Sequence, residues 1–214
     1  MMLQTPEQLM AATGCTRDRA ILFLPHLQAT MKAYEITTPR RMAGFLSQIA
    51  HESARLTQLR ESLNYSVDGL LKTFGRHRIS ETQAKQFGRA PGRPANQEAI
   101  ANALYGGAWG ARNLGNVMEG DGHRFVGRGL KQLTGRDNYR RCGLALREDF
   151  IMHPQKLEHP MWASLSAGWF WQSNGLNAIA DRGDVRQMTK VVNGGQIGLA
   201  ERTALYNQGL QALA

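Results

Sequence analysis

The spacing of apolar side chains along the chain predicts a mainly helical protein. In the segment that begins at Thr38-Pro39, apolar residues recur at intervals that place them on one face of a helix: Met42, Phe45, Leu46, Ile49 and Leu56. A second apolar run contains Trp162, Trp169, Phe170 and Trp171 and predicts a helix over Met161–Ser173, ended by Asn174-Gly175.

Helix-start signals predict further helices. Thr5-Pro6-Glu7-Gln8 has a capping threonine, a proline at the first helical position and a glutamine at the third. Ser80-Glu81-Thr82-Gln83 repeats the capping pattern. The other helices predicted from caps and periodicity are Arg17–Ala33, Ser80 to Gly88, Asn96 to Tyr105, Thr134 to about Cys142, Asp184–Val192 and Leu199–Leu210.

Glycine-rich segments divide these helices. Gly106–Gly129 has no helical periodicity and is predicted to be a long ordered loop, which is often functional. Phe125–Thr134 suits a short extended hairpin. Because the composition changes over Ser66–Tyr105, we expect a small helical lobe at about residues 66–105, inserted into a large lobe at about 1–65 and 106–214. Together they would form a single domain.

Composition excludes several classes of protein. A chain of 214 residues with 42% hydrophobic residues can bury a core without metals or disulfides. No apolar run approaches the length of a membrane span, and the first ten residues lack the features of a secretory signal, so no membrane insertion is expected. The two cysteines, Cys15 and Cys142, are interpreted as free thiols of a protein made in a reducing compartment.

The charge balance indicates a polyanionic partner. Lys and Arg number 26 against 17 Asp and Glu, a formal net charge of +9, which suits nucleic acid, anionic lipid or an acidic cell wall. The arginines are scattered and aromatic residues are only 7%, which is not typical of a dedicated nucleic-acid reader. No nucleic-acid partner is therefore expected.

Several catalytic patterns are absent. His51-Glu52 invites comparison with zinc proteases, but the second histidine would be needed at the position of Arg55. There is no phosphate-binding loop, Gly127-Arg128-Gly129 has no third glycine for a dinucleotide site, and no nucleophile elbow is present. The six histidines do not cluster at metal-ligand spacing.

Two carboxylates offer acid-base chemistry. At ~100° per residue, Glu52 lies on the shoulder of the apolar stripe, with Gln48 one turn before it. Apolar surroundings disfavour the ionised form of a carboxyl group and so favour the protonated form, and a general acid must be protonated to act. The alternative is a charged residue at the edge of an amphipathic helix.

Glu61 lies nine residues after Glu52. On one straight helix the two would be separated by ~13.5 Å of rise and face opposite ways, whereas the carboxylates of inverting glycosidases lie ~6.5–9.5 Å apart. Glu61 can therefore cooperate with Glu52 only if the helix breaks, and the weak helix formers from Ser62 to Ser66 favour a break near Leu59–Ser62. The alternative is a solvated glutamate at a helix end.

Other polar residues have two interpretations each. Gln132 and Thr134, two apart on an extended strand, would point the same way and could hold an N-acetyl group or a water. Thr134 could equally be a helix N-cap, Asn193 a C-cap next to Gly194, and Arg202 a surface charge.

Four groups of motifs together resemble glycoside hydrolase family 19, which has a chitinase-like, lysozyme-like helical fold, and in particular its bacteriophage and prophage endolysin branch. They occur in family order over roughly residues 38–210: Ala50-His51-Glu52-Ser53, Glu61 to Ser66, Phe125 to Thr134 with Asn138-Tyr139, and Val192-Asn193-Gly194-Gly195 with Glu201-Arg202.

The resemblance implies a role for each matched residue. Glu52 would be the general acid, Glu61 the general base that activates water with inversion, and Thr134 would help to position that water. Arg202 would lie near the base carboxylate and tune its charge. Substrate-binding roles are implied for Gln132, Asn138, Tyr139, Asn193 and Arg202. No metal or cofactor is expected.

Three departures favour the endolysin branch over plant chitinases. Leu130-Lys131 follows Gly-Arg-Gly where many members have proline, there are two cysteines rather than several disulfides, and the second glutamate follows after only nine residues. The implied enzyme is a monomeric peptidoglycan muramidase that consists of a single catalytic domain without a separate wall-binding module. It would be kept in the host bacterial cytoplasm and released to the wall through a separate pore. The alternatives are a chitinase, a lytic transglycosylase, an injected antibacterial effector, or a catalytically dead basic protein that binds wall polymer or nucleic acid.

Overall fold

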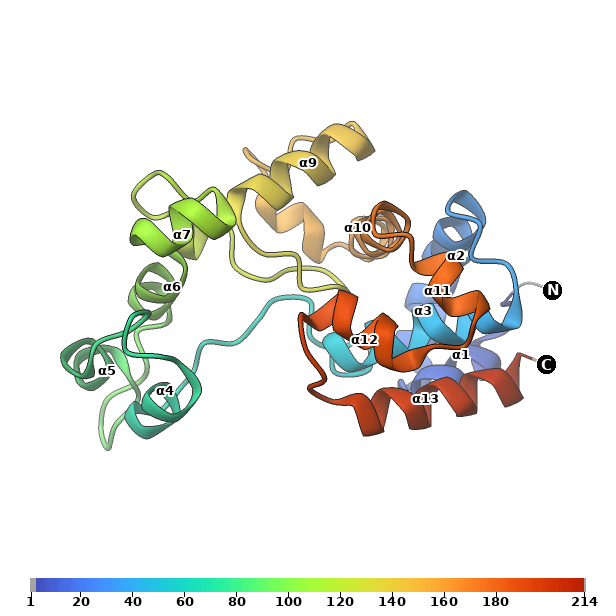
Figure 1. Cartoon of the computed structure of the whole chain (residues 1–214), viewed down its shortest axis with the longest axis horizontal. Helices are drawn as coiled ribbons and strands as arrows, with labels where there is room; N and C mark the ends of the chain where they lie inside the picture. Colours follow the sequence, from blue (N-terminus) through green and yellow to red (C-terminus); the bar gives the residue numbers. More distant parts are fainter. Residues whose placement is uncertain (1–2, 214) are drawn as a thin grey trace. The chain divides into compact units, whose positions relative to one another are not determined.

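A computed structural model of the chain describes residues 3–213 and divides them into two compact units (Figure 1). The first unit comprises the chain up to Leu59, the short segment Gly129–Gln132, and the chain from Gln155 onward. The second comprises Arg60–Arg128 and Leu133–Pro154. The second unit thus contains the predicted small lobe and extends it at both ends.

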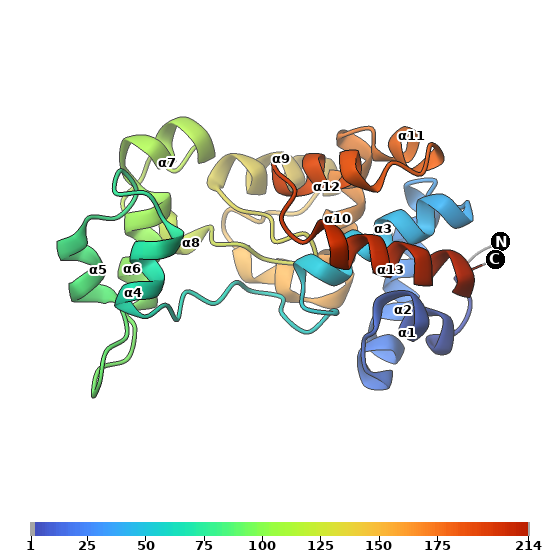
Figure 2. The same cartoon turned by 60° about the horizontal axis from the view of Figure 1, so that its bottom comes forward.

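The first unit is a bundle of helices around α3 (Figure 2). The helices of this unit are α1 (Pro6–Thr13), α2 (Arg17–Ala33), α3 (Pro39–Glu52), α10 (Pro160–Ser173), α11 (Leu176–Asp181), α12 (Val185–Asn193) and α13 (Leu199–Ala212). The 3₁₀ helix Pro154–Glu158 comes directly before α10 in the chain.

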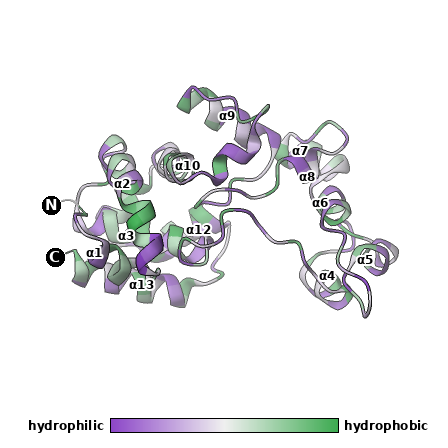
Figure 3. Cartoon of the chain, turned by 180° about the vertical axis from the view of Figure 1, so that it is seen from behind, coloured by the Kyte–Doolittle hydropathy of each residue, from purple (hydrophilic) through white to green (hydrophobic). Residues whose placement is uncertain are grey.

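Helix α3 is the centre of this bundle, and Figure 3 colours much of it as hydrophobic. Every residue from position 42 to position 50 is buried. The Phe45 ring meets Trp171 of α10 edge to face, with centroids 5.5 Å apart. A Cβ at Gly44 would lie 2.8 Å from the Met188 sulfur of α12, so only glycine allows these helices to approach so closely. Nine consecutive buried residues cover every side of a helix, so this part of α3 is buried all round. Four of the five residues of the predicted stripe lie in it, whereas Leu56 follows the end of the helix.

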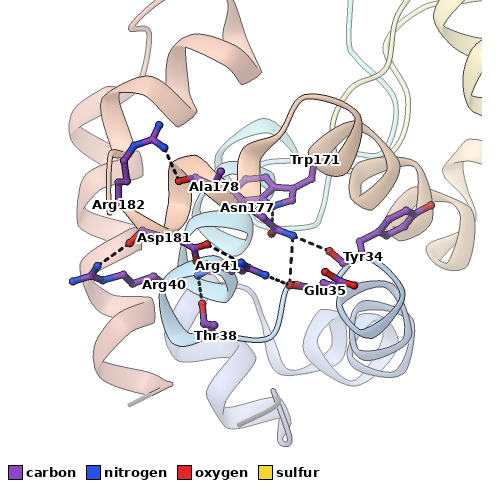
Figure 4. Close-up of polar contacts among 10 residues, drawn as sticks. All are labelled: Tyr34, Glu35, Thr38, Arg40, Arg41, Trp171, Asn177, Ala178, Asp181 and Arg182. Carbon is purple, nitrogen blue, oxygen red and sulfur yellow. Dashed lines mark hydrogen bonds and ion pairs between the residues drawn. The ribbon is translucent and has the colours of Figure 1, made fainter.

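The start of α3 is fixed by polar contacts (Figure 4). The Arg41 guanidinium forms two hydrogen bonds with the Asp181 carboxylate, at 2.8 and 2.7 Å, and donates a third to the Glu35 carbonyl. This guanidinium holds the pKa of Asp181 below its usual value. Asn177 accepts a hydrogen bond from the Trp171 indole and donates to the Tyr34 carbonyl. Arg41 thus joins the first turn of α3 to α11, and Asn177 joins α11 to α10 and to the end of α2.

The second unit has its own small core, formed by buried apolar residues: Leu63, Leu70, Ile79, Ala84, Ile100, Ala101, Leu104 and Val126. Its helices are α4 (Val67–Thr73), α5 (Glu81–Phe87), α6 (Gln97–Tyr105), α7 (Gly107–Leu114), α8 (Asp121–Arg124) and α9 (Arg136–Leu146).

The prediction that Gly106–Gly129 is a loop without helix is wrong, because α7 and α8 lie within it. The reason is tertiary packing, which overrides the low helix propensity of glycine. The Arg78 guanidinium stacks over the Trp109 ring of α7 at 3.3 Å from its centroid. The Asn116 side chain donates to the Tyr105 carbonyl and accepts from the Arg136 amide, which ties the end of α7 to α6 and α9.

The predicted hairpin is present as a tight turn rather than a sheet. Arg128 and Leu133 exchange two backbone hydrogen bonds, at 3.1 and 2.8 Å. Arg128 also pairs with Arg60 in an isolated antiparallel bridge, and no regular strand occurs in residues 3–213. The two cysteines are buried free thiols, as predicted, and burial raises the pKa of Cys142 to about 12. None of the described helices has the length and apolar character needed to span a bilayer.

Candidate active site

Glu52 is the last residue of α3, so the helix ends before the predicted break near Leu59–Ser62. Ser53 ends it: its hydroxyl donates to the Ile49 carbonyl at 2.6 Å and accepts from the Leu56 amide at 3.0 Å. Ala54, Arg55 and Leu56 then adopt positive φ angles of 47°, 59° and 66°. Glu52 and Glu61 are therefore not on one helix, and the straight-helix separation does not apply.

The left-handed turn after Glu52 is supported from α2. The Arg19 guanidinium donates two hydrogen bonds to the Leu56 carbonyl, one of them from Nε at 2.7 Å. Three consecutive non-glycine residues with positive φ are energetically costly, and such strain persists only where the surroundings over-determine it. The hydrogen bonds of Ser53 and Arg19 hold the strained turn in place and thereby fix the end of α3.

The Glu52 carboxylate is bound by Arg202 of α13, whose Nη2 donates to Oε1. The Arg202 side chain is only 1% exposed and that of Glu52 15%. Arg202 Nη1 also donates to the Gln48 side-chain oxygen at 2.6 Å, and Gln48 in turn donates to the Thr189 hydroxyl at 3.4 Å. Gln48, noticed in the sequence only for its position one turn before Glu52, is thus part of a buried polar chain that ends at Glu52.

The alternative that Arg202 is a surface charge is wrong, and a side chain that is 1% exposed cannot make the substrate contact that the motifs implied. Its guanidinium lies inside the first unit against Glu52, the residue matched to the general acid. The chain separation of 150 residues between them explains why no local pattern could have revealed the pair.

A second cation lies near Glu52, namely Lys131. Burial lowers the pKa of its amine, and the charge of Glu52 partly opposes that change. Its Nζ also lies 4.6 Å from the centroid of the Phe170 ring. Lys131 was noticed in the sequence only as a departure from the family pattern, and no signal assigned it a place beside Glu52.

Removal of the Arg202 guanidinium should destabilise the first unit. In Arg202→Met the Glu52 carboxylate and the Gln48 amide oxygen lose their buried donor, so we expect the free energy of unfolding to fall by about 3 kcal/mol. Urea denaturation measures it. Arg55→Met is the matched control, because Arg55 is exposed and its Nη2 lies 3.8 Å from Glu201 Oε1. This substitution should lower the free energy of unfolding by less than about 1 kcal/mol. Equal effects of the two substitutions would contradict a structural role for the Arg202 pair.

Glu61 belongs to the second unit, where two donors hold its carboxylate. The Tyr105 hydroxyl donates to Oε2 at 2.7 Å and the Gly127 amide to Oε1 at 2.5 Å, while the Glu61 amide donates to the Gly127 carbonyl at 2.9 Å. Burial and the Glu61 charge raise the pKa of Tyr105, so its hydroxyl keeps its proton. Glu61 is thus oriented from α6 and from the 125–128 segment, and is not a freely solvated glutamate.

Sequence reasoning missed both of these donors. Tyr105 appeared only as the last residue of a predicted helix, and Gly127 acts through its backbone. The chain separation between Glu61 and its donors is 44 residues for Tyr105 and 66 for Gly127. Only the fold of the second unit brings these groups together.

Gln132 is not part of an extended strand. Its φ is +56°, and its side-chain nitrogen donates to the Gly129 carbonyl at 2.8 Å and to the Gln58 carbonyl at 3.1 Å. Side chains two residues apart point the same way only along an extended strand. The prediction that Gln132 and Thr134 do so therefore loses its premise. The Gln132 amide stabilises the turn at 129–132.

Thr134 is not the N-cap of the following helix. Helix α9 begins at Arg136, and its cap residue is Gly135 at φ 94°, without a capping side chain. The Thr134 carbonyl accepts from the Asn138 side chain at 2.7 Å, and the Asn138 oxygen accepts from Arg141. Thr134 and Asn138 are both half-buried on the second unit.

Tyr139, predicted to contact substrate, is fully buried. Its hydroxyl donates to the Val126 carbonyl at 2.5 Å and accepts from Arg128 at 3.0 Å. A side chain without accessible surface cannot contact a substrate, so the prediction is corrected: Tyr139 supports the 126–128 backbone from the inside.

Asn193 is the last residue of α12, and Gly194 follows in the left-handed conformation. The exposed Asn193 side chain donates to the Ile197 carbonyl at 3.4 Å, across the loop before α13. The C-cap is Gly194 itself, so Asn193 lies one residue before the cap position that the alternative interpretation gave it. Among residues 3–213 no group of three or more His, Cys, Asp or Glu could hold a metal ion.

Comparison with known proteins gives one informative sequence match and a consistent fold. No protein-family model matches the chain. A protein of Haemophilus influenzae described as a glycosyl hydrolase family 19 domain-containing protein is 36% identical over 169 residues, which is 78% of this chain and 76% of that protein. At this identity and coverage, the two chains belong to the same family.

Among the similar solved structures are two chitinases. Chitinase C from Streptomyces griseus matches 98% of this chain and 76% of its own, with a TM-score of 0.60 and 18% identity. The family 19 class IV chitinase from Zea mays matches 99% of this chain and 82% of its own, with a TM-score of 0.51 and 16% identity. At such low identities these structures establish the chitinase-like fold alone.

Proposed function

The chain belongs to glycoside hydrolase family 19, and from this premise we propose that it is a muramidase, which cleaves the β-1,4 bond between N-acetylmuramic acid and N-acetylglucosamine in peptidoglycan and so lyses the bacterial cell wall. The observation that favours the wall over chitin is the net charge of +9. Peptidoglycan carries carboxylates whereas chitin is neutral, so only the former gains from a basic protein.

In this proposal the two carboxylates have complementary roles. Glu52 donates its proton to the glycosidic oxygen as the bond to the anomeric carbon breaks. Glu61 accepts a proton from the water that attacks that carbon on the opposite face of the sugar, so the product is inverted at the anomeric centre. The Thr134 hydroxyl helps to position the water.

The surroundings hold each carboxylate in one position. Arg202, itself bonded to Gln48, fixes the Glu52 side chain at the end of α3, which limits the entropy that the transition state must still lose. Tyr105 and the Gly127 amide both donate to Glu61 and orient its carboxylate in the same way. Gln132, Asn138 and Asn193 remain proposed contacts of the sugar chain, whereas the buried Tyr139 and Arg202 do not.

The proposal includes a partner and a place of action. The partner is the glycan strand of peptidoglycan, and the enzyme acts as a monomer without a cofactor. We propose that it accumulates in the host bacterial cytoplasm and reaches the wall through a separate membrane pore, as in the endolysin branch that the motifs resemble.

Mass spectrometry of the fragments released from purified peptidoglycan tests the function. We expect reducing-end muramic acid, because a muramidase leaves its new reducing end on that sugar. Reducing-end glucosamine would indicate a glucosaminidase, and an anhydro sugar would indicate a lytic transglycosylase. If nothing is released from peptidoglycan but chitin oligomers are cleaved, the enzyme is a chitinase; if neither polymer is cleaved, a catalytically dead binding protein is favoured.

A further inference from the structure

A cavity of about 320 Å³ lies beside Glu61, entirely within the second unit. Its size is at the lower end for small-molecule sites, enough for a substituent of a sugar rather than a whole oligosaccharide. Besides the buried apolar side chains of Leu63 and Val126, the lining is polar: Arg60, Glu61, Ser62, Gln97 and His123.

The Arg60 guanidinium is held in place by His123. Its Nη2 lies 3.0 Å from His123 Nε2. Because arginine donates and never accepts, Nε2 must be the acceptor and the ring proton must be on Nδ1, which lies 4.0 Å from the exposed Glu98 carboxylate. The His123 amide donates to the Asn102 side chain of α6 at 2.8 Å, which anchors the supporting residue.

The positive charge of Arg60 is not neutralised within the protein. No carboxylate in the described part of the chain forms an ion pair with it, and both oxygens of its neighbour Glu61 already accept from other donors. A guanidinium has five N–H donors, of which one is used on His123, and the rest suit a carboxylate in bidentate geometry. A supported, unpaired arginine at the edge of a cavity is what a carboxylate site requires.

We propose that Arg60, supported by His123, binds a carboxylate carried by the muramyl residue of the substrate and thereby selects peptidoglycan over chitin. The inference rests on the proposed function and deepens it. The carboxylate has two possible sources, the lactyl group of muramic acid after the peptide has been removed, or the stem peptide where it is attached. Both present the same chemistry to a guanidinium.

The test compares four soluble glycan substrates. Strands with intact stem peptides and strands stripped of peptide by an amidase are each used as prepared and after conversion of their carboxylates to neutral methylamides. The measured quantity is the ratio of kcat/KM for the free over the amidated form of each strand. Wild-type enzyme is expected to give a ratio of about 10 to 100, the range of one charge-assisted hydrogen bond or pair, and Arg60→Gln a ratio near one.

The two kinds of strand identify the source of the carboxylate. If Arg60→Gln lowers the ratio of kcat/KM only for stripped strands, the carboxylate is that of the lactyl group. If it lowers the ratio only for peptide-bearing strands, the carboxylate is that of the stem peptide. Arg112→Gln is the matched control, because it removes the same charge from an exposed position of α7 that does not line the cavity, and it should keep the wild-type ratio.

Two results would overturn the inference while leaving the proposed function intact. One is a wild-type enzyme that cleaves free and amidated strands equally well. The other is an Arg60→Gln variant that keeps the wild-type ratio, or loses it only as far as Arg112→Gln does. A wild-type enzyme that cleaves none of the four strands would instead overturn the proposed function, and the inference with it.

Discussion

Glu52→Gln is expected to abolish cleavage of peptidoglycan while the fold is retained. The amide has the size of the carboxyl group but no acidic proton to give to the leaving oxygen, and general acid catalysis is worth about 10²–10⁴ in rate. Its oxygen can still accept from Arg202 Nη2, so the contact that joins α3 to α13 survives. Release of reducing ends from purified peptidoglycan measures the loss, which we expect to reach at least about 10³.

Two controls make the Glu52 result decisive. Thermal unfolding of the variant should stay cooperative but with a lower midpoint, because the buried Arg202 guanidinium loses its counter-charge, and activity is measured below that midpoint. Glu7→Gln removes an exposed carboxylate from the same unit, where it pairs with Arg17 on the surface, and should keep full activity. Full activity of Glu52→Gln would show that another group donates the proton.

Glu61→Gln is expected to reduce hydrolysis to a comparable extent, because an amide cannot accept the proton of the attacking water. The variant can keep both local contacts, since the amide oxygen accepts from the Gly127 amide and the amide nitrogen donates to the Tyr105 oxygen. The same reducing-end assay measures the loss, with Glu119→Gln as an exposed control in the second unit.

The Glu61 variant also separates hydrolase from transglycosylase. A lytic transglycosylase needs no base to activate water, so it should tolerate the substitution and continue to release anhydro sugars. Near-wild-type hydrolysis by Glu61→Gln, with muramic acid still at the reducing end, would reduce Glu61 to a structural residue that holds the 125–128 segment.

The elements that could be predicted from the sequence are those that local signals determine. Helix α2 has the predicted bounds Arg17–Ala33, and the capping patterns at Thr5 and Ser80 both begin helices as expected. Four residues of the predicted apolar stripe are buried in α3, and Glu52 is the last residue of that helix. In each case the deciding contacts are within a few residues of one another, so a window of sequence contains them.

The parts that escaped prediction depend on contacts between distant residues. Arg19 fixes the end of α3 by a hydrogen bond. In the same way Arg202 holds the Glu52 carboxylate, and Tyr105 holds the Glu61 carboxylate. None of these partners lies within a helical turn of the residue it fixes. Helix α7 forms in a glycine-rich segment for the same reason, because its stability comes from packing rather than propensity.

The discontinuous first unit has a consequence for synthesis of the protein on the ribosome. Its first three helices emerge early, but α13, which packs along α3 and supplies Arg202, emerges after all the others. At about 5–20 residues per second, the 150 residues from Glu52 to Arg202 take about 8 to 30 seconds to synthesise. During that interval α3 lacks its main covering helix and Glu52 lacks its guanidinium. A nascent chain therefore has no complete acid site until α13 has been made.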